Sequence, residues 1–417
     1  MPNNPNSPGI EWRNHWTVVL AAFFGVSLGS LHVYSTGLFI QPLEQELEWS
    51  RSKITSGLTL VSLMGVLFSP FVGILIDRWG PRRLAVPGAA LFCLAFAGLS
   101  LARGPIWTWW GLWLLIATLA LALKPTIWSA AISSHFSKSR GLALAIAFCG
   151  TGFGSTIIPL LADHLINELG WRGAYMALGG IFFVGTVPLL FIFFHDAKSS
   201  KAKALNTREQ KPPIPLSGWS VGQGLRSRQF FQLALSALLI TAVIVGLVVH
   251  IVPLLSDAGL PRQTVVKIAS LIGVTSIVGR LTVGYLFDRL PGPPVGMISV
   301  GLPMVAAAII LLFPGSLAMS VIAVIFLGLS VGGEYDAIIY LSTRYFGLKN
   351  FGTLFGFVTS LLLAGVGLGP LFGGLLYDLS GDYTLFLIAV IPLSAVTCIL
   401  LGTLGPYPDH ETISDKG

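Results

Sequence analysis

The sequence predicts an all-α membrane protein whose twelve transmembrane helices form two pseudo-symmetric six-helix bundles. Three observations lead to this fold class. Charged residues make up only 10% of the 417 positions, whereas soluble domains carry about 25%. The apolar residues gather in runs of about 20, the length that crosses a bilayer core as a helix. The runs form two groups of six, and the second group repeats features of the first.

Each predicted transmembrane helix corresponds to one apolar run. The runs cover residues 16–40, 52–76, 84–102, 106–133, 141–162, 173–194, 229–255, 264–286, 295–313, 317–341, 352–376 and 383–403.

The composition of the chain changes after residue 194. Residues 195–228 are rich in Lys, Arg and Pro and contain no apolar run, which is typical of a linker. We therefore predict an N-terminal six-helix bundle over residues 1–194 and a basic cytoplasmic linker over 195–228. A C-terminal six-helix bundle with a short cytoplasmic tail follows over 229–417.

The two predicted bundles are related by a constant offset of 211 positions, which indicates a parallel internal repeat. The offset maps Gly73, Asp77 and Arg78 onto Gly284, Asp288 and Arg289, Pro42 onto Pro253, and Gly170 onto Gly381.

Lys and Arg lie mainly on one side of the predicted membrane. Seventeen of the 25 fall on the side of the N-terminus, six on the other side and two within helices. The positive-inside rule then predicts that both termini are cytoplasmic. This asymmetry explains the net charge of +7. We therefore expect the basic residues to face membrane lipid, and we expect no nucleic-acid partner. We expect a multi-pass protein of the plasma membrane (the inner membrane in a bacterium), whose first run is a retained helix and not a cleaved signal.

The most specific motif lies between the second and third runs. Residues 73–83 read Gly-Ile-Leu-Ile-Asp-Arg-Trp-Gly-Pro-Arg-Arg, and residues 284–289 echo the first part. This motif resembles the loop signature of the major facilitator superfamily, G-x-x-x-D-R-x-G-x-R-R, at every fixed position. The resemblance implies the major facilitator fold and a loop that controls the cytoplasmic gate, with a simple topological anchor as the alternative. The expected gate residues are Gly73, Asp77, Arg78, Gly80, Arg82, Arg83, Gly284, Asp288 and Arg289.

A second resemblance concerns the subfamily. Residues 135–143 form an aromatic and basic cluster ahead of the glycine-rich segment 150–154, and residues 344–347 precede a second glycine-rich helix. Both patterns resemble the monocarboxylate transporters. The oxalate–formate exchangers are also similar, but they carry a lysine in the eleventh helix. Run 352–376 has no Lys or Arg, which favours a cargo with one carboxylate.

Arg280 is the strongest candidate for a substrate contact. It lies inside an apolar run, and charged residues inside a membrane usually face a cavity or a partner. Its position resembles the eighth-helix arginine that binds the substrate carboxylate in monocarboxylate transporters. The alternative is a structural ion pair with Glu334 or Asp336. The chain departs from the family pattern twice, because Ser276 replaces the acid one turn earlier and Tyr34 replaces the first-helix lysine.

Further polar residues in the predicted helices complete the candidate site. Lys124 lies at the pseudo-symmetric depth of residues 334–336, so it either pairs with Glu334 or Asp336 across the two bundles or contacts the anion. His250 and His32 could carry a coupling proton, and backbone-bonded helix histidines are the alternative. The expected substrate contacts are Arg280, Tyr34, His250, Ser276, Lys124 and Tyr383, and the proton-coupling candidates are His250, His32, Glu334 and Asp336.

Glycines four residues apart have a structural explanation. Gly150 and Gly154 share one helix face, as do Gly365, Gly369 and Gly373, and such spacing lets membrane helices cross closely. We predict a packing role and no dinucleotide site, because a fingerprint of that kind requires a soluble βαβ unit.

The expected function is secondary active transport of a small organic carboxylate by alternating access, most simply as proton symport. An organic-anion exchanger is the alternative, and a transport-dead sensor is a more distant one. The sequence has no His/Asp/Glu metal cluster and no nucleophile with a base at helical spacing, so we expect no enzyme, no metal and no cofactor.

Overall fold

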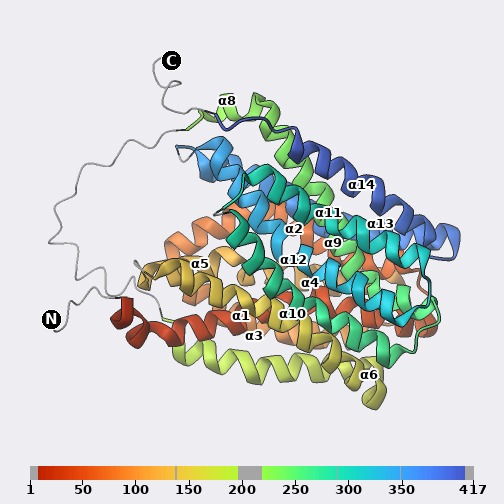
Figure 1. Cartoon of the computed structure of the whole chain (residues 1–417). Coiled ribbons are helices and arrows are strands. Elements are labelled where there is room, and N and C mark those ends of the chain that lie inside the picture. Colours follow the sequence, from red (N-terminus) through yellow and green to blue (C-terminus); the bar gives the residue numbers. More distant parts are fainter. Residues whose placement is uncertain (1–7, 137–138, 196–217, 288, 348, 409–417) are drawn as a thin grey trace. The chain divides into compact units, whose positions relative to one another are not determined.

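The chain folds into helices, as the computed structural model shows for residues 8–136, 139–195, 218–287, 289–347 and 349–408 (Figure 1). Within these ranges the single pairing of strand type is an isolated bridge between Gly218 and Gly347. The elements are α1 (Pro8–Leu47), α2 (Arg51–Trp79), α3 (Pro81–Gly98), η1 (Leu99–Leu101), α4 (Ile106–Ala120), η2 (Leu121–Leu123), α5 (Pro125–His135), α6 (Arg140–Phe193), α8 (Val221–Arg226), α9 (Arg228–Asp257), α10 (Arg262–Phe287), α11 (Gly292–Leu312), α12 (Leu317–Phe346), α13 (Phe351–Ser380) and α14 (Thr384–Gly402).

The helices match the predicted membrane passages. Among the described residues, 10 helical stretches are long and apolar enough to cross a membrane. One of them, Gly141–Phe193, covers two predicted runs, and α2 covers the remaining run. The all-α fold class predicted from the sequence is therefore confirmed.

The chain separates into two compact units. The first comprises residues 1–48 and 67–210, and the second comprises 49–66 and 211–417. The division runs through α2, because residues 49–66 pack with the residues that follow position 210 and residues 67–79 pack with the first unit. The order of the apolar runs along the sequence did not predict this division of α2.

In the first unit, α1 packs along α6 and also contacts α3 and α5. Glycine permits the close crossing of α1 and α6. A Cβ atom at Gly150 would overlap the carbonyl oxygen of Phe23, and one at Gly154 would overlap the hydroxyl of Ser30. The predicted packing role of this glycine pair is confirmed.

The fourth predicted run is broken in the structure. The helix stops after η2, Lys124 adopts an extended backbone conformation, and α5 starts at Pro125. The indole N–H of Trp128 donates to the carbonyl oxygen of Leu123 at 2.9 Å, which satisfies one backbone acceptor at the break. The corresponding helix of the second half, α12, continues through the equivalent positions.

In the second unit, α9 packs against α13, α10 against α12, and α11 against α12 and α14. Gly365, Gly369 and Gly373 line the side of α13 that faces α9, where added Cβ atoms would overlap backbone or His250 atoms. The predicted packing role is confirmed here too.

Two glycines mark equivalent turns in the two halves. Gly170, between the two runs within α6, has a φ of 66°, and Gly381, between α13 and α14, has a φ of 80°. Residues with a Cβ atom rarely adopt a positive φ, which glycine adopts without steric cost. The 211-residue offset therefore relates two positions that both need a positive φ, although their ψ angles differ (172° and −1°).

The last part of the predicted linker is structured. Ser220 and Gln223 form a capping box that starts α8, and the buried ring of Trp219 packs near Phe346. Residues 196–217 lie outside the described ranges. The sequence analysis did not predict this short capped helix, because the linker as a whole is polar.

Candidate functional site

Arg280 of α10 forms an ion pair with Asp336 of α12. The Nε atom lies 3.2 Å from the Oδ2 atom, and the two side chains are 25% and 33% exposed. Both lie on membrane-spanning helices of the second unit. An ion pair that is only partly covered by protein can exchange one partner for an incoming ion.

Close helix packing places this pair. A Cβ atom at Gly332 would overlap the carbonyl oxygen of Ser276, and one at Gly279 would overlap that of Leu329. The two helix backbones therefore touch one turn before Asp336 and beside Arg280. The hydroxyl of Ser276 donates to the carbonyl oxygen of Gly273 at 2.8 Å, so the residue at the expected acid position bonds to its own helix. The acid beside Arg280 comes from α12 instead.

Glu334 lies near this pair on α12 but is buried. It is 9% exposed, and within the described part of the chain its Oε2 atom has no hydrogen-bond partner. It follows Ser330 by one helical turn, and the Ser330 hydroxyl donates to the carbonyl oxygen of Ser299 on α11 at 2.7 Å. Carboxyl groups inside the membrane relay protons in pumps and transporters, which suits the predicted role of Glu334 in proton coupling. That role remains a proposal.

Lys124 belongs to the first unit and lies at the break before α5. Its position at the start of a half-helix suits an anion contact, because helix N-termini attract negative charge. The predicted pairing with Glu334 or Asp336 would join the two units and remains a prediction. Asp336 already has a cationic partner in Arg280.

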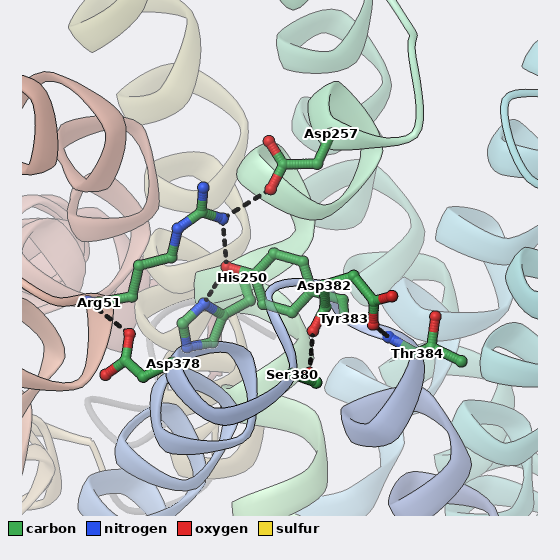
Figure 2. Close-up of polar contacts among 8 residues, drawn as sticks. All are labelled: Arg51, His250, Asp257, Asp378, Ser380, Asp382, Tyr383 and Thr384. Carbon is green, nitrogen blue, oxygen red and sulfur yellow. Dashed lines mark hydrogen bonds and ion pairs between the residues drawn. The ribbon is translucent and has the colours of Figure 1, made fainter.

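His250 and Tyr383 bond to each other. The Nδ1 atom of His250 lies 2.8 Å from the Tyr383 hydroxyl, and its Nε2 atom lies 2.8 Å from the carbonyl oxygen of Pro370. Both ring nitrogens therefore have a partner, one of them a backbone carbonyl. Figure 2 shows that Arg51 and Asp257 extend this network. The sequence prediction missed these two residues because their charges at helix ends resemble ordinary loop charges.

The two remaining candidates, His32 and Tyr34, lie on α1 in the first unit. His32 is buried against the rings of Phe92 and Trp113. Within the described ranges its Nδ1 atom has no hydrogen-bond partner. Tyr34 is half-buried. Their predicted roles in proton coupling and substrate binding remain untested.

The loop motif contributes a turn and an anchor to the first unit. Gly80 has a φ of 82° and lies immediately before α3, which explains the glycine at this motif position. The Arg82 guanidinium donates to the carbonyl oxygen of Phe191 at 2.7 Å. Arg78 and Arg83 are exposed. The Asp77 side chain lies outside the described part of the structure, so the gate role remains a proposal.

The echo of the motif is less informative. Arg289 lies over the ring of Tyr285 at 4.3 Å. A Cβ atom at Gly284 would meet no atom within 4 Å, so packing does not require this glycine. Asp288 lies outside the described ranges.

Comparison with known proteins agrees with the membrane fold. The sequence profile of the Major Facilitator Superfamily matches residues 18–360. Monocarboxylate transporter 11 of Mus musculus is 28% identical over 396 residues, which cover 92% of this chain and 85% of that protein. Monocarboxylate transporter 13 of Bos taurus is 25% identical, covering 88% and 84%. The uncharacterized MFS-type transporter YhjX of Escherichia coli (strain K12) is 24% identical and covers 88% of each chain.

Solved structures show the same fold at lower identity. A D-xylose-proton symporter has a TM-score of 0.73 at 12% identity, covering 94% of this chain and 98% of that one. A bacterial homologue of the human lysosomal transporter Spinster, inward-facing and unoccupied, has a TM-score of 0.67 at 16% identity, covering 93% and 91%.

Proposed function

Because the chain belongs to the major facilitator superfamily, we propose that it is a secondary active transporter that moves a small monocarboxylate with a proton by alternating access. The observation that carries this proposal is the partly exposed ion pair of Arg280 and Asp336 inside the membrane-spanning helices. The relatives named monocarboxylate transporters support the substrate class.

In this proposal, Asp336 pairs with Arg280 when no cargo is bound. Protonation makes Asp336 neutral, so the guanidinium loses its counter-ion and becomes available to a carboxylate. Arginine suits this exchange because it stays charged and offers paired N–H donors that match a carboxylate. One proton and one monoanion then bind together, and the transported charge is zero. Ser276 cannot supply this proton switch, whereas an acid on the neighbouring helix can.

Other residues would assist in this cycle. We propose Glu334 as a second proton carrier and Lys124 as an anion contact from the first unit. We propose that the loop from Gly73 to Arg83 controls the cytoplasmic gate. The transporter would lie in the plasma membrane with both termini in the cytoplasm, and its activity would be transport without an enzymatic reaction.

Uptake into proteoliposomes tests the proposal. Labelled acetate, propionate and lactate are offered as probes with an inward proton gradient. We expect accumulation of at least one acid, no response to membrane voltage, and no competition by the amide of the same acid. Arg280→Ala should abolish uptake, whereas Arg103→Ala, which removes an exposed loop charge, should not.

Two outcomes would contradict proton symport and favour another function. Uptake that ignores proton ionophores but requires an internal anion would identify an exchanger. If no acid were transported by protein that still melts cooperatively, the transport-dead sensor would remain.

A further inference from the structure

Arg51 is a buried arginine at the end of a helix. It is the first residue of α2, yet its side chain is only 4% exposed. Long cationic side chains at membrane helix ends normally extend to water. Exposed Lys53 follows in the same turn and serves as a comparison. Burial of Arg51 beside such a neighbour indicates a specific set of partners.

The partners of Arg51 come from three other segments of the second unit (Figure 2). Its NH1 atom donates to Oδ2 of Asp257 at 2.7 Å and to the hydroxyl of Tyr383 at 3.0 Å. Its guanidinium carbon lies 3.6 Å from the ring centre of Tyr377, which is a cation–π contact. The side chain thus connects the end of α9, the end of α13 and the residue before α14.

The backbone at the start of α2 is held as well. The Asp378 carboxylate accepts the N–H groups of Arg51 and Ser52, each at 3.1 Å. These are donors that a helix start leaves without internal partners, and a negative charge there is favourable. A residue at the end of α13 therefore caps the N-terminus of α2.

Small residues let α2 lie directly on α13. A Cβ atom at Gly374 would come within 2.7 Å of the Ser52 nitrogen, and one at Gly367 within 2.7 Å of the Ser62 Cβ atom. The hydroxyl of Thr59 donates to the carbonyl oxygen of Gly367 at 2.8 Å. We call residues 51–59 with these partners on α9, α13 and Tyr383 the α2 latch.

Hydrogen-bond direction links the latch to His250. The carbonyl oxygen of Pro370 only accepts, so Nε2 of His250 carries a hydrogen and donates to it. In a neutral ring Nδ1 is then an acceptor, and the Tyr383 hydroxyl donates to it. Burial raises the pKa of Tyr383, so this hydroxyl keeps its hydrogen. The Tyr383 oxygen is left to accept from Arg51. With neutral His250, every donor in the latched arrangement thus has an acceptor.

We propose that the α2 latch closes the end of the transport path opposite the Gly73–Arg83 loop, and that protonation of His250 releases it. The proposal rests on the alternating-access transport proposed above and on the predicted orientation, which places this end outside. Residues 67–79 of α2 belong to the first unit, so release would let residues 51–66 move with the rest of their helix.

The release follows from the groups around His250. A protonated ring donates from both nitrogens, so the Tyr383 oxygen would face two cationic donors, and its own hydrogen would lose its acceptor. Other charged and titratable groups near the ring are Asp378 and Tyr377 of α13, Asp257 of α9 and Arg51 itself. The carboxylates of Asp257 and Asp378 already accept hydrogen bonds from Arg51. Neither can bind a protonated His250 without weakening its contact with Arg51.

The pH dependence has a definite sign. The latch is fully formed when His250 is neutral, and it weakens as pH falls through the range in which histidine takes up a proton in water, around 6.5. Below that range, each further pH unit shifts the closed-to-open ratio by up to about tenfold. Acid on the outside would thus open the end that admits a proton-coupled cargo.

Spin-label distances test the latch without any cargo. Labels are attached at Arg103→Cys and Lys267→Cys, which are exposed positions of the first and second units on the predicted outer side. The native cysteines Cys93, Cys149 and Cys398 are replaced by alanine, and thermal melting checks the fold. Distance distributions are recorded in lipid nanodiscs at about pH 7.5 and about pH 5.5, on either side of the histidine range.

The starting protein should change from a short to a long distance on acidification. Arg51→Ala should favour the long distance at both pH values by about tenfold, since it removes a charge-assisted contact. His250→Gln should stay short at both, because glutamine offers a donor and an acceptor but takes up no proton. Lys53→Ala, which removes the exposed neighbouring charge, should behave as the starting protein.

An unchanged distribution on acidification, or an Arg51→Ala distribution equal to that of Lys53→Ala, would overturn the latch. If Arg51→Ala does not fold, Tyr383→Phe replaces it. This variant keeps the contact with Asp257 but separates Arg51 from His250, so it should lose the pH response, and a retained response would refute the proposed link. Failure of the cargo proposal would leave these distances unaffected.

Discussion

Replacement of Asp336 by asparagine should imitate the proton-loaded site. Asparagine has nearly the same shape as aspartate but carries no charge, so Arg280 would lose its ionic partner while the helix packing at Gly332 is kept. If Asp336 competes with the cargo carboxylate, Asp336→Asn should bind the anion more tightly than the original protein at neutral pH.

The size of this effect follows from the geometry of the pair. A hydrogen bond to a charged group is worth about 1.5–3 kcal/mol. The two side chains are 25% and 33% exposed, so protein encloses the pair only in part, and we take the lower end of that range. About 1.4 kcal/mol corresponds to a tenfold change in affinity. We therefore expect anion affinity at neutral pH to rise about tenfold and its dependence on pH to disappear.

Isothermal titration of purified Asp336→Asn with lactate at neutral and acid pH measures both effects. Glu168→Gln, which removes an exposed carboxylate of the first unit, is the matched control and should bind like the original protein. In proteoliposomes the variant should keep counterflow and lose proton-driven accumulation. Weaker binding by a well-folded variant, or an unaltered pH dependence, would show that Asp336 holds Arg280 in place and does not exchange with the cargo.

Three further predictions concern other residues. Arg280→Ala should weaken anion binding at least tenfold, and Arg280→Lys should recover little because a point charge does not replace the paired donors; near-normal affinity by titration would return Arg280 to a structural role. Lys124→Ala should lower the melting temperature if the lysine pairs with an acid, since breaking a buried pair costs about 3–5 kcal/mol, whereas weaker anion binding at unchanged stability would place it in the substrate site. Asp77→Asn should slow counterflow and bias cysteine accessibility towards the inward-open state without loss of expression, and an unchanged accessibility pattern would argue for a simple anchor.

Much of the fold was predictable because hydrocarbon imposes simple demands on a sequence. Helices must be long and apolar, so run lengths alone located the passages. Glycine spacing predicted a close helix crossing at Gly150, because the absence of a Cβ atom has one common use in such helices, and the structure identifies α1 as the partner. The offset between Gly170 and Gly381 corresponded to a shared need for a positive φ.

The candidate site was less predictable, because polar partners depend on which helices meet. The alternative ion pair of Arg280 was open between Glu334 and Asp336, and only the contact of α10 with α12 at Gly332 selects Asp336. The environment of Arg51 could not be derived at all. Its partners lie more than 200 positions away, and a charge at a helix end gives no signal of burial.

The break between η2 and α5 links residues that lie far apart in the sequence. The Trp128 indole that satisfies the Leu123 carbonyl needs room, and a Cβ atom at Gly25 of α1 would come within 2.6 Å of that ring. A bulkier residue 25 would displace the tryptophan and leave the buried Leu123 carbonyl without this partner, which costs about 1–3 kcal/mol. Among descendants of a common ancestor, positions 25 and 128 should therefore be replaced together or not at all. Loss of this break during evolution would then require coordinated substitutions in two helices.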